Sequence, residues 1–403
     1  MTIDQARALD AADPLGFARQ RFALPQDVIY LDGNSLGALP VATAARVART
    51  IHDEWGRDLI ASWNKHGWIE QSARLATMLA PIVGAGADEL LVGDSTSINL
   101  AKLLGAALGL RPGRRVILSE TGNFPTDLYI AAAVPGAELR TVAAGDIAAA
   151  LTDEVAVLML TQVDYRSAAV HDMAAMTHAA HAAGALLLWD LSHSAGAVQL
   201  DLAGSGADLA VGCGYKYLNG GPGAPAFLFA ARALQDALAN PLPGWFGHAE
   251  PFAFEPAYRP APGIARFTSG TPSIIAMAAL EAGLATFEGI DIAAIEAKSR
   301  ALSELFRAEI AARCPELALA SPADPARRGS HLVFACPNAY PLMQALIARG
   351  VIGDYREPNL VRFGFAPLYN GFEEMVRAAT IVAEVLATRE WDDPRFHQRA
   401  KVT

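Results

Sequence analysis

Residues 208–223 read DLAVGCGYKYLNGGPG. A strand-like run ends in Gly212-Cys213-Gly214, and Lys216 then stands between two tyrosines. Three more glycines follow, so protein can enclose this lysine tightly. Enclosure favours the neutral amine, which is the nucleophilic form. Most lysines are exposed to solvent, and Lys216 by itself therefore does not define a site.

An acidic residue ends a second apolar run, in GALLLWDLSHSAG (residues 184–196). A carboxylate at Asp190 is costly there unless it has a partner. The pyridine nitrogen of pyridoxal 5′-phosphate (PLP) is such a partner, because an acid keeps that nitrogen protonated and the ring able to accept electrons. His193 stands three residues on, where it can support the aspartate or the ring. The alternative is a turn or helix-cap aspartate with an ordinary polar neighbour.

Two more polar segments follow strand-like runs. Residues 90–108 read LLVGDSTSINLAKLLGAAL, and the small hydroxyl residues Thr96 and Ser97 open a helical pattern. Backbone N–H groups at a helix start can hold a phosphate, although N-capping alone also explains these residues. Phe124-Pro125-Thr126-Asp127 places an aromatic ring that either stacks on a cofactor or fills the core.

The order of these features carries more weight than any one of them. A phosphate cap, an aromatic ring, an aspartate and a lysine follow one another along the chain. Each stands just after a strand-like run, and α/β sheets bind ligands at the carboxyl ends of their strands. Together they predict a PLP enzyme of the aminotransferase-like type I fold.

The whole chain shows the alternation of strands and helices that this fold requires. Helical patterns at Ser97–Leu108 and Asp172–Ala183 lie between apolar runs, which predicts a mainly parallel sheet with helices on both faces. The predicted strands are Leu90–Val92, Arg115–Leu118, Val155–Leu160, Ala185–Trp189, Leu209–Val211 and Ala226–Phe229.

A smaller C-terminal α/β lobe begins near residue 290, where apolar residues recur at helical spacing. Its predicted elements are one long helix through Ile292 and Ile310, strand His331–Ala335, helix Pro341–Arg349, strand Asn359–Phe365 and helix Phe372–Ala387. We therefore expect a large PLP-binding domain at 46–275 and a small domain made of 1–45 and 276–403.

Composition narrows the class of protein. The 403 residues carry a net charge of −10 without a basic block, which argues against nucleic acid as a partner. The three cysteines have no paired spacing, so we expect neither a disulfide framework nor a metal site. No apolar run reaches the ~18 residues of a membrane helix, and no signal peptide is recognised. A cytoplasmic enzyme without membrane contacts is the expectation.

The sequence resembles the kynureninase family, PLP enzymes of the type I fold with a seven-stranded-type sheet, over nearly its whole length. The matching stretches are YLDGNSLG (30–37), FPTD (124–127), WDLSH (189–193), YKYLN (215–219), GWFGH (244–248) and RFGFAPLYN (362–370). The resemblance implies hydrolysis of L-kynurenine to anthranilate and L-alanine, in tryptophan catabolism, with 3-hydroxykynurenine as a second candidate substrate.

The resemblance also implies a role for each matched residue. Lys216 carries the cofactor as a Schiff base and moves the Cα proton, Asp190 pairs with the ring nitrogen, and Tyr215 is the candidate general acid or base. Arg362 binds the substrate carboxylate as a two-pronged donor. The further cofactor contacts are Thr96, Ser97, Phe124, Asp127, Thr161, His193, Trp245 and Thr271, and the side-chain pocket is lined by Asn34, Ser35 and Trp63. Around Thr161 the segment TQVDYRSAAV departs from the family pattern.

Two of these residues, Trp245 and Thr271, imply a homodimer, because in the family they reach the neighbouring subunit's cofactor phosphate. Two alternatives remain open. One is a cysteine desulfurase or class V aminotransferase; a desulfurase requires a reactive cysteine, for which Cys336 is the candidate by position. A PLP-binding fold that has lost catalysis and acts as a regulator is the other.

Overall fold

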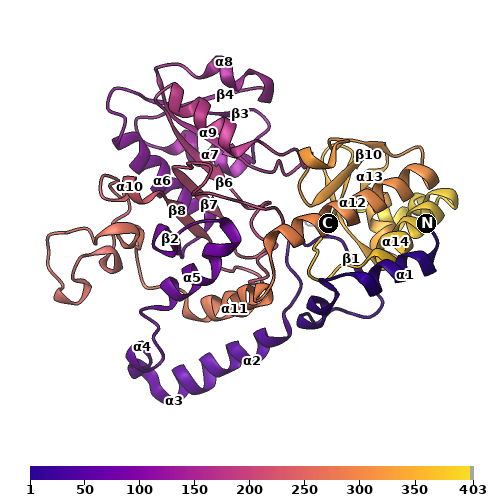
Figure 1. The fold of residues 1–403 in the computed structure, drawn as a ribbon, viewed down its shortest axis with the longest axis horizontal. Coiled ribbons are helices and arrows are strands. Elements are labelled where there is room, and N and C mark those ends of the chain that lie inside the picture. The colour runs from indigo at the N-terminus through magenta and orange to yellow at the C-terminus, as the bar shows by residue number, and fades with distance from the viewer. Residues whose placement is uncertain (400–403) are drawn as a thin grey trace.

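The computed structural model describes residues 1–399 as two lobes, the larger of which holds the segments around Lys216 (Figure 1). A seven-stranded sheet in the order β2-β8-β7-β6-β5-β3-β4 forms its centre. Every neighbouring pair is parallel except at β8, which runs antiparallel to β2 and β7. This confirms the predicted α/β class. The strands are β2 (Leu90–Val92), β3 (Val116–Glu120), β4 (Glu138–Val142), β5 (Val155–Thr161), β6 (Leu186–Asp190), β7 (Leu209–Gly212) and β8 (Phe227–Ala230).

Helices cover both faces of this sheet, because alternate strand residues point to opposite sides. In β6, Leu186 and Leu188 belong to the apolar cluster formed with helix α6. Leu187 and Trp189 belong to the cluster on the other face. Helices α6 (Thr96–Gly109) and α7 (Pro125–Ala133) lie on the first face, and α5 (Gln71–Val83) and α9 (Met173–Ala182) contribute to the second. Short helices α8 (Ile147–Ala150) and α10 (Arg232–Gln235) complete the lobe, and α11 (Ile274–Leu284) packs against α5.

The small lobe is an antiparallel sheet, β12-β13-β10-β9, packed on helices. Its elements are α12 (Ile292–Arg313), β9 (Ala318–Leu319), β10 (His331–Ala335), α13 (Ala339–Ala348), β11 (Val351–Ile352), β12 (Asp354–Arg356), β13 (Leu360–Gly364) and α14 (Phe372–Ala387). The N-terminal segment joins this lobe: α1 (Ile3–Ala12) packs against α14, and β1 (Ile29–Tyr30) pairs in parallel with β11. Within residues 1–399, none of the helices combines the length and apolar character needed to cross a bilayer.

An arm of short helices extends away from the larger lobe at the lower edge of Figure 1. It comprises α2 (Val41–Arg49), a π-helical turn at Thr50–Trp55, α3 (Gly56–Asp58) and α4 (Ser62–Lys65). The arm carries Trp63, and α2 also packs against α11.

The predicted boundaries agree best with the structure where the hydrophobic pattern is clear, and worst at the sheet edge. Strand β10 and helix α14 have the predicted bounds, whereas strand β4 was not predicted at all. β4 is an edge strand whose residues are partly exposed, so it lacks a continuous apolar run. The predicted domain boundary between 275 and 276 falls inside α11, and we propose instead that the large domain continues to the loop before α12. Residues 400–403 of the predicted small domain lie outside the described range.

Candidate active site

Lys216 and His193 meet at the carboxyl ends of two neighbouring parallel strands. Lys216 follows β7 and His193 follows β6. The Lys216 Nζ atom lies 3.1 Å from Nε2 of His193 and 5.7 Å from the ring centre of Tyr215. Burial, together with the nearby Lys216 amine, lowers the pKa of His193 well below its ordinary value. His193 is therefore neutral at physiological pH and available for hydrogen bonding to the amine.

The N-terminal glycine motif packs directly on the lysine segment. The Gly37 N–H donates to the carbonyl oxygen of Tyr215 at 2.8 Å. A Cβ atom at Gly37 would lie 2.4 Å from the carbonyl oxygen of Lys216, so only glycine permits this approach. This hydrogen bond holds the N-terminal segment, which is part of the small lobe, against the loop that carries Lys216.

Two buried carboxylates lie beside each other near the lysine. Asp190 is the last residue of β6 and accepts a hydrogen bond from the N–H of Ser192 at 2.8 Å. Asp127 stands in the first turn of α7. Burial and the adjacent Asp190 carboxylate raise the pKa of Asp127 to about 9, so at neutral pH Asp127 holds a proton. Its Oδ2 atom is buried and has no hydrogen-bond partner within residues 1–399.

Phe124 is positioned by a residue that the sequence pattern did not single out, Asn123. The Asn123 Oδ1 atom accepts from the N–H of Phe124 at 2.7 Å and from the hydroxyl of Thr161 at 2.5 Å. Its Nδ2 donates to Ser119 Oγ at 3.0 Å. The Phe124 ring is 41% exposed and meets Tyr165 edge to face at 5.2 Å. Thr161 thus supports the Phe124 loop here, and its contact with a cofactor remains a prediction.

A cavity of about 330 Å³ opens at the start of α6, beside Tyr215. Thr96 and Tyr215 line it, whereas Ser97, one residue further along the helix, does not. The first N–H groups of a helix have no partner within the helix, which makes this a suitable place for an anion. Asp94 also lines the cavity, and the fully buried Lys102 neutralises it at a Nζ–Oδ2 distance of 2.5 Å.

The environment of Tyr215 keeps its phenol protonated. Burial, and secondarily the neighbouring Cys213 thiol, raise the pKa of Tyr215 above its ordinary value. The phenol is therefore neutral at physiological pH. The neutral phenol can donate a hydrogen bond, but its raised pKa makes it a weaker acid than a free tyrosine, so the role of Tyr215 as general acid or base stays a prediction.

Arg362 lies at the centre of a buried polar cluster in the small lobe. Its side chain is 1% exposed, and its Nε donates to Asp354 Oδ1 at 2.8 Å. Its Nη2 donates to Ser35 Oγ at 3.0 Å. With its amide oxygen turned toward the guanidinium, Asn34 accepts from Nε at 2.9 Å and from Nη2 at 3.2 Å. The structure thus brings together three predicted substrate-binding residues, and adds Asp354, which no motif had indicated.

The remaining predicted residues gather elsewhere in this chain. Trp63 packs between Trp68 and Phe246, at ring-centre distances of 5.6 and 5.8 Å. Trp245 is 38% exposed and contacts the ring of Phe246. Thr271 is exposed as well. Trp63, Trp245 and Thr271 do not line the cavity at the start of α6.

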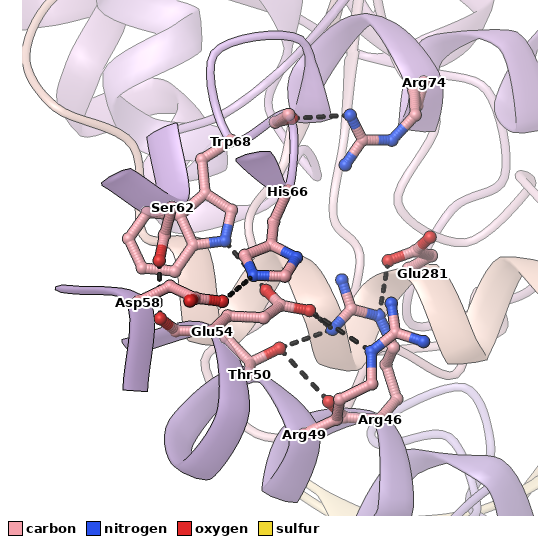
Figure 2. A network of polar contacts seen from close by, with 11 residues as sticks. Arg46, Arg49, Thr50, Glu54, Asp58, Ser62, His66, Trp68, Arg74 and Glu281 are labelled. Carbon is pink, nitrogen blue, oxygen red and sulfur yellow. Dashed lines mark hydrogen bonds and ion pairs between the residues drawn. The ribbon is translucent and has the colours of Figure 1, made fainter. Parts of the chain in front are cut away.

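Figure 2 shows the polar network that fixes the Trp63 arm. Glu54, on the π-helical turn, is almost fully buried and accepts from Trp68 Nε1 at 2.8 Å. Arg46 and Arg49 pair with the same carboxylate, at 3.0 and 3.3 Å. These hydrogen bonds and ion pairs keep the pKa of Glu54 below its ordinary value despite the opposing effect of burial. An ionised Glu54 thus holds the arm's helices in place, and no motif in the sequence indicated this role.

Solved structures of similar fold come from PLP-related enzymes. The apo cysteine desulfurase of Thermococcus onnurineus NA1 superposes with a TM-score of 0.79 at 18% identity, over 92% of this chain and 98% of that one. A mutant of C-DES with glycine covalently linked to its PLP cofactor gives a TM-score of 0.78 at 17% identity, over 90% and 98% of the two chains. At these identities the likeness establishes the fold alone.

Comparison with sequence relatives identifies the family as well as the fold. The model of the kynureninase C-terminal domain matches residues 295–382. The kynureninase of Pseudomonas fluorescens is 50% identical, and that of Burkholderia mallei (strain SAVP1) 51% identical, each over 414 aligned residues that cover both chains completely. Identity of this extent over the full length of both chains shows that the chain belongs to the kynureninase family.

Proposed function

We propose that this protein hydrolyses L-kynurenine to anthranilate and L-alanine, with PLP attached at Lys216. The observation that carries the proposal is the group formed by Lys216, His193 and the paired carboxylates at one edge of the sheet. It occurs in a chain whose full length is half identical to proteins named kynureninase. A protein that only shared the fold would not need this complete set.

The residues of the site fit PLP. The buried Oδ2 of Asp127 lacks a partner in the described part of the chain, and Asp127 and Asp190 are the residues that would hold the protonated ring nitrogen of PLP. The exposed part of the Phe124 ring offers an apolar surface for stacking. The cavity at the start of α6 offers backbone N–H groups to a phosphate.

Each side chain then has a defined task. When bound, PLP supplies an electron sink for the electrons released at the substrate Cα. Lys216 takes and returns the Cα proton, and neutral His193, 3.1 Å away, orients its amine. Asp190 holds positive charge at the ring nitrogen. Neutral Tyr215 donates a hydrogen bond near the substrate γ-carbonyl, where one water is consumed as the Cβ–Cγ bond breaks.

The direct test is anthranilate release from L-kynurenine, measured with and without added PLP. We expect PLP-dependent turnover and one L-alanine for each anthranilate. A protein that binds PLP yet leaves L-kynurenine intact would contradict the proposal and favour a regulator instead. Parallel assays with 3-hydroxy-L-kynurenine and with L-cysteine test the second candidate substrate and desulfurase activity.

The environment of the cysteines argues against a desulfurase. All three cysteines are buried. Burial raises the pKa of Cys336 to about 11, which leaves almost no thiolate at neutral pH. A persulfide-forming nucleophile needs the opposite environment.

Arg362→Lys should raise KM for L-kynurenine by roughly 10- to 100-fold, the loss associated with one or two charge-assisted hydrogen bonds. Lysine offers a point charge and cannot bind Asp354 and a carboxylate in one plane. Steady-state kinetics measure the effect. The matched control is Arg328→Lys, since Arg328 is equally buried and pairs with Glu304 away from the site. Equal KM values in Arg362→Lys and wild type would place the substrate carboxylate elsewhere.

We further propose a homodimeric enzyme of the cytoplasm that acts in tryptophan catabolism by the kynurenine route, which also feeds NAD biosynthesis. The dimer is supported by the exposed positions of Trp245 and Thr271 in the single chain. Trp245 and Thr271 are predicted to contact the cofactor. From exposed positions, they can do so only in the site of a second copy of the chain. Closed two-fold dimers are also the commonest oligomers.

Mixing two inactive variants should restore activity if the sites are shared. One variant is Lys216→Ala, and the other combines Trp245→Ala with Thr271→Ala. A mixed dimer then contains one site with every residue intact, so up to half of the wild-type activity per mixed dimer is expected. Light scattering checks the dimer, and labelled subunits verify exchange. No recovery after verified exchange would show that each site is built from one chain.

A further inference from the structure

A second arginine stands next to Arg362 on the same face of the small sheet. Strands β12 and β13 pair with Asp354 opposite Arg362. Arg356 is two residues from Asp354 on β12, so both side chains point to the same face. Asp354 therefore lies between two guanidinium groups: it pairs with Arg362, and its Oδ2 lies 2.7 Å from Nη2 of Arg356.

Protein acceptors already occupy most of the Arg362 guanidinium. Asp354 accepts from both Nε and Nη2, which uses one of the two edges that can bind a carboxylate with two parallel N–H groups. Along the other edge, Nη2 donates to Ser35 Oγ at 3.0 Å and Nη1 donates to the carbonyl oxygen of Tyr165 at 2.6 Å. One N–H of Nη1 is left without an acceptor in residues 1–399. Arg362 alone thus has little capacity for a further carboxylate.

Arg356 has N–H donors free to bind a carboxylate, which Arg362 largely lacks. Its side chain is 35% exposed, and its contacts are Asp354 and, at 3.5 Å, Ser35 Oγ. Its Nε is buried without a partner in the described chain. Most buried donors are paired, so this guanidinium is unusually under-used.

The arginine cluster also lies next to a residue that contacts Phe124. Arg362 donates to the carbonyl oxygen of Tyr165 at 2.6 Å, and the Tyr165 ring meets the Phe124 ring edge to face at 5.2 Å. Ser35, between the two arginines, is itself among the predicted substrate-binding residues.

We propose that Arg356 is a second carboxylate-binding arginine, which takes the substrate α-carboxylate together with Ser35 and the free N–H of Arg362. Asp354 is then the shared counter-ion that positions both arginines and is not displaced. The inference deepens the proposed function, because it assigns a new contact to the substrate of the same site.

The charges of the cluster favour an anionic ligand. The pKa of Asp354 is lowered and its carboxylate is ionised, so one negative charge faces two guanidinium groups. The other nearby acid, Asp32, has its pKa raised to about 7, first by burial and then by the negative charge of Asp354. At neutral pH about half of the molecules have Asp32 protonated; in these the cluster carries one positive charge in excess, and a bound carboxylate balances it.

The test compares ligands with and without the carboxylate charge. In Arg356→Ala and Arg356→Gln, kcat/KM for L-kynurenine should fall by roughly 10- to 100-fold, while kcat/KM for its α-carboxamide changes by less than about threefold. Inhibition by L-alanine should weaken by a similar factor, and inhibition by L-alaninamide should not. Arg356→Lys should restore part of the loss. The control is Arg389→Ala, an exposed arginine of the same lobe, which should leave every value unchanged.

Each outcome decides one point. Equal losses for acid and amide ligands, or no loss for either, overturn the carboxylate role of Arg356. Melting temperatures identify misfolded variants, and if both the Ala and Gln variants fail to fold, Arg356 is structural and the proposal is wrong. A wild-type protein that binds L-alanine through Arg356 but does not hydrolyse L-kynurenine would refute the proposed function alone.

Discussion

Replacing Lys216 by alanine is expected to abolish kynurenine hydrolysis, with a loss of at least roughly a thousandfold. Proton transfer by a positioned side chain contributes about 10²–10⁴ in rate, and this variant loses the covalent attachment of the cofactor as well. The fold should persist, because Lys216 is only partly buried and its side chain hydrogen-bonds to His193. Anthranilate release and the visible absorbance of attached cofactor are the two measurements.

Two comparisons sharpen this prediction. Lys216→Arg keeps the positive charge but cannot form the covalent link, and it should be as inactive as the alanine variant. Small primary amines added to Lys216→Ala should return part of the proton-transfer activity, because the removed side chain leaves room beside His193. Substantial hydrolysis by either variant without added amine would remove Lys216 from the mechanism.

The second large effect is expected for Asp190→Asn, which should lower kcat by roughly 10²- to 10³-fold, the range for loss of one preorganised electrostatic group. A neutral amide cannot hold positive charge at the ring nitrogen. PLP should still bind, since the cavity at the start of α6 and the Phe124 ring are unchanged. Steady-state kinetics with saturating PLP measure the loss.

Asp127→Asn is the matched control, because Asp127 is an equally buried neighbour. In the chain without cofactor, burial and Asp190 raise the pKa of Asp127 to about 9, so Asp127 is the neutral member of the pair, and asparagine resembles that neutral form. The loss in Asp127→Asn should therefore be much smaller than in Asp190→Asn. Equal losses in the two variants would mean that the carboxylates act as one unit, and a few-fold loss at Asp190 would reduce it to a structural residue.

The sequence alone predicted the fold class and the family. Its strands are short apolar runs and its helices are longer amphipathic patterns, so local periodicity was enough for β10 and α14. It also indicated where the chemistry lies, because parallel strands end at a common edge. Lys216 and His193 were chosen as residues that follow strands, and they meet there at 3.1 Å.

Only the tertiary structure decided how the site residues pair. Asp354 and Arg356 stand on a short strand without a motif, and their place beside Arg362 depends on the register between β12 and β13. The role of Asn123 likewise depends on β5 bringing Thr161 to it. Hydrophobic periodicity indicates which face of a helix or strand is buried. It is a local property, read from the residues of a single element. Hydrogen bonds and pKa values depend on atoms that the fold brings within a few ångströms from distant parts of the chain, and no local pattern encodes those contacts.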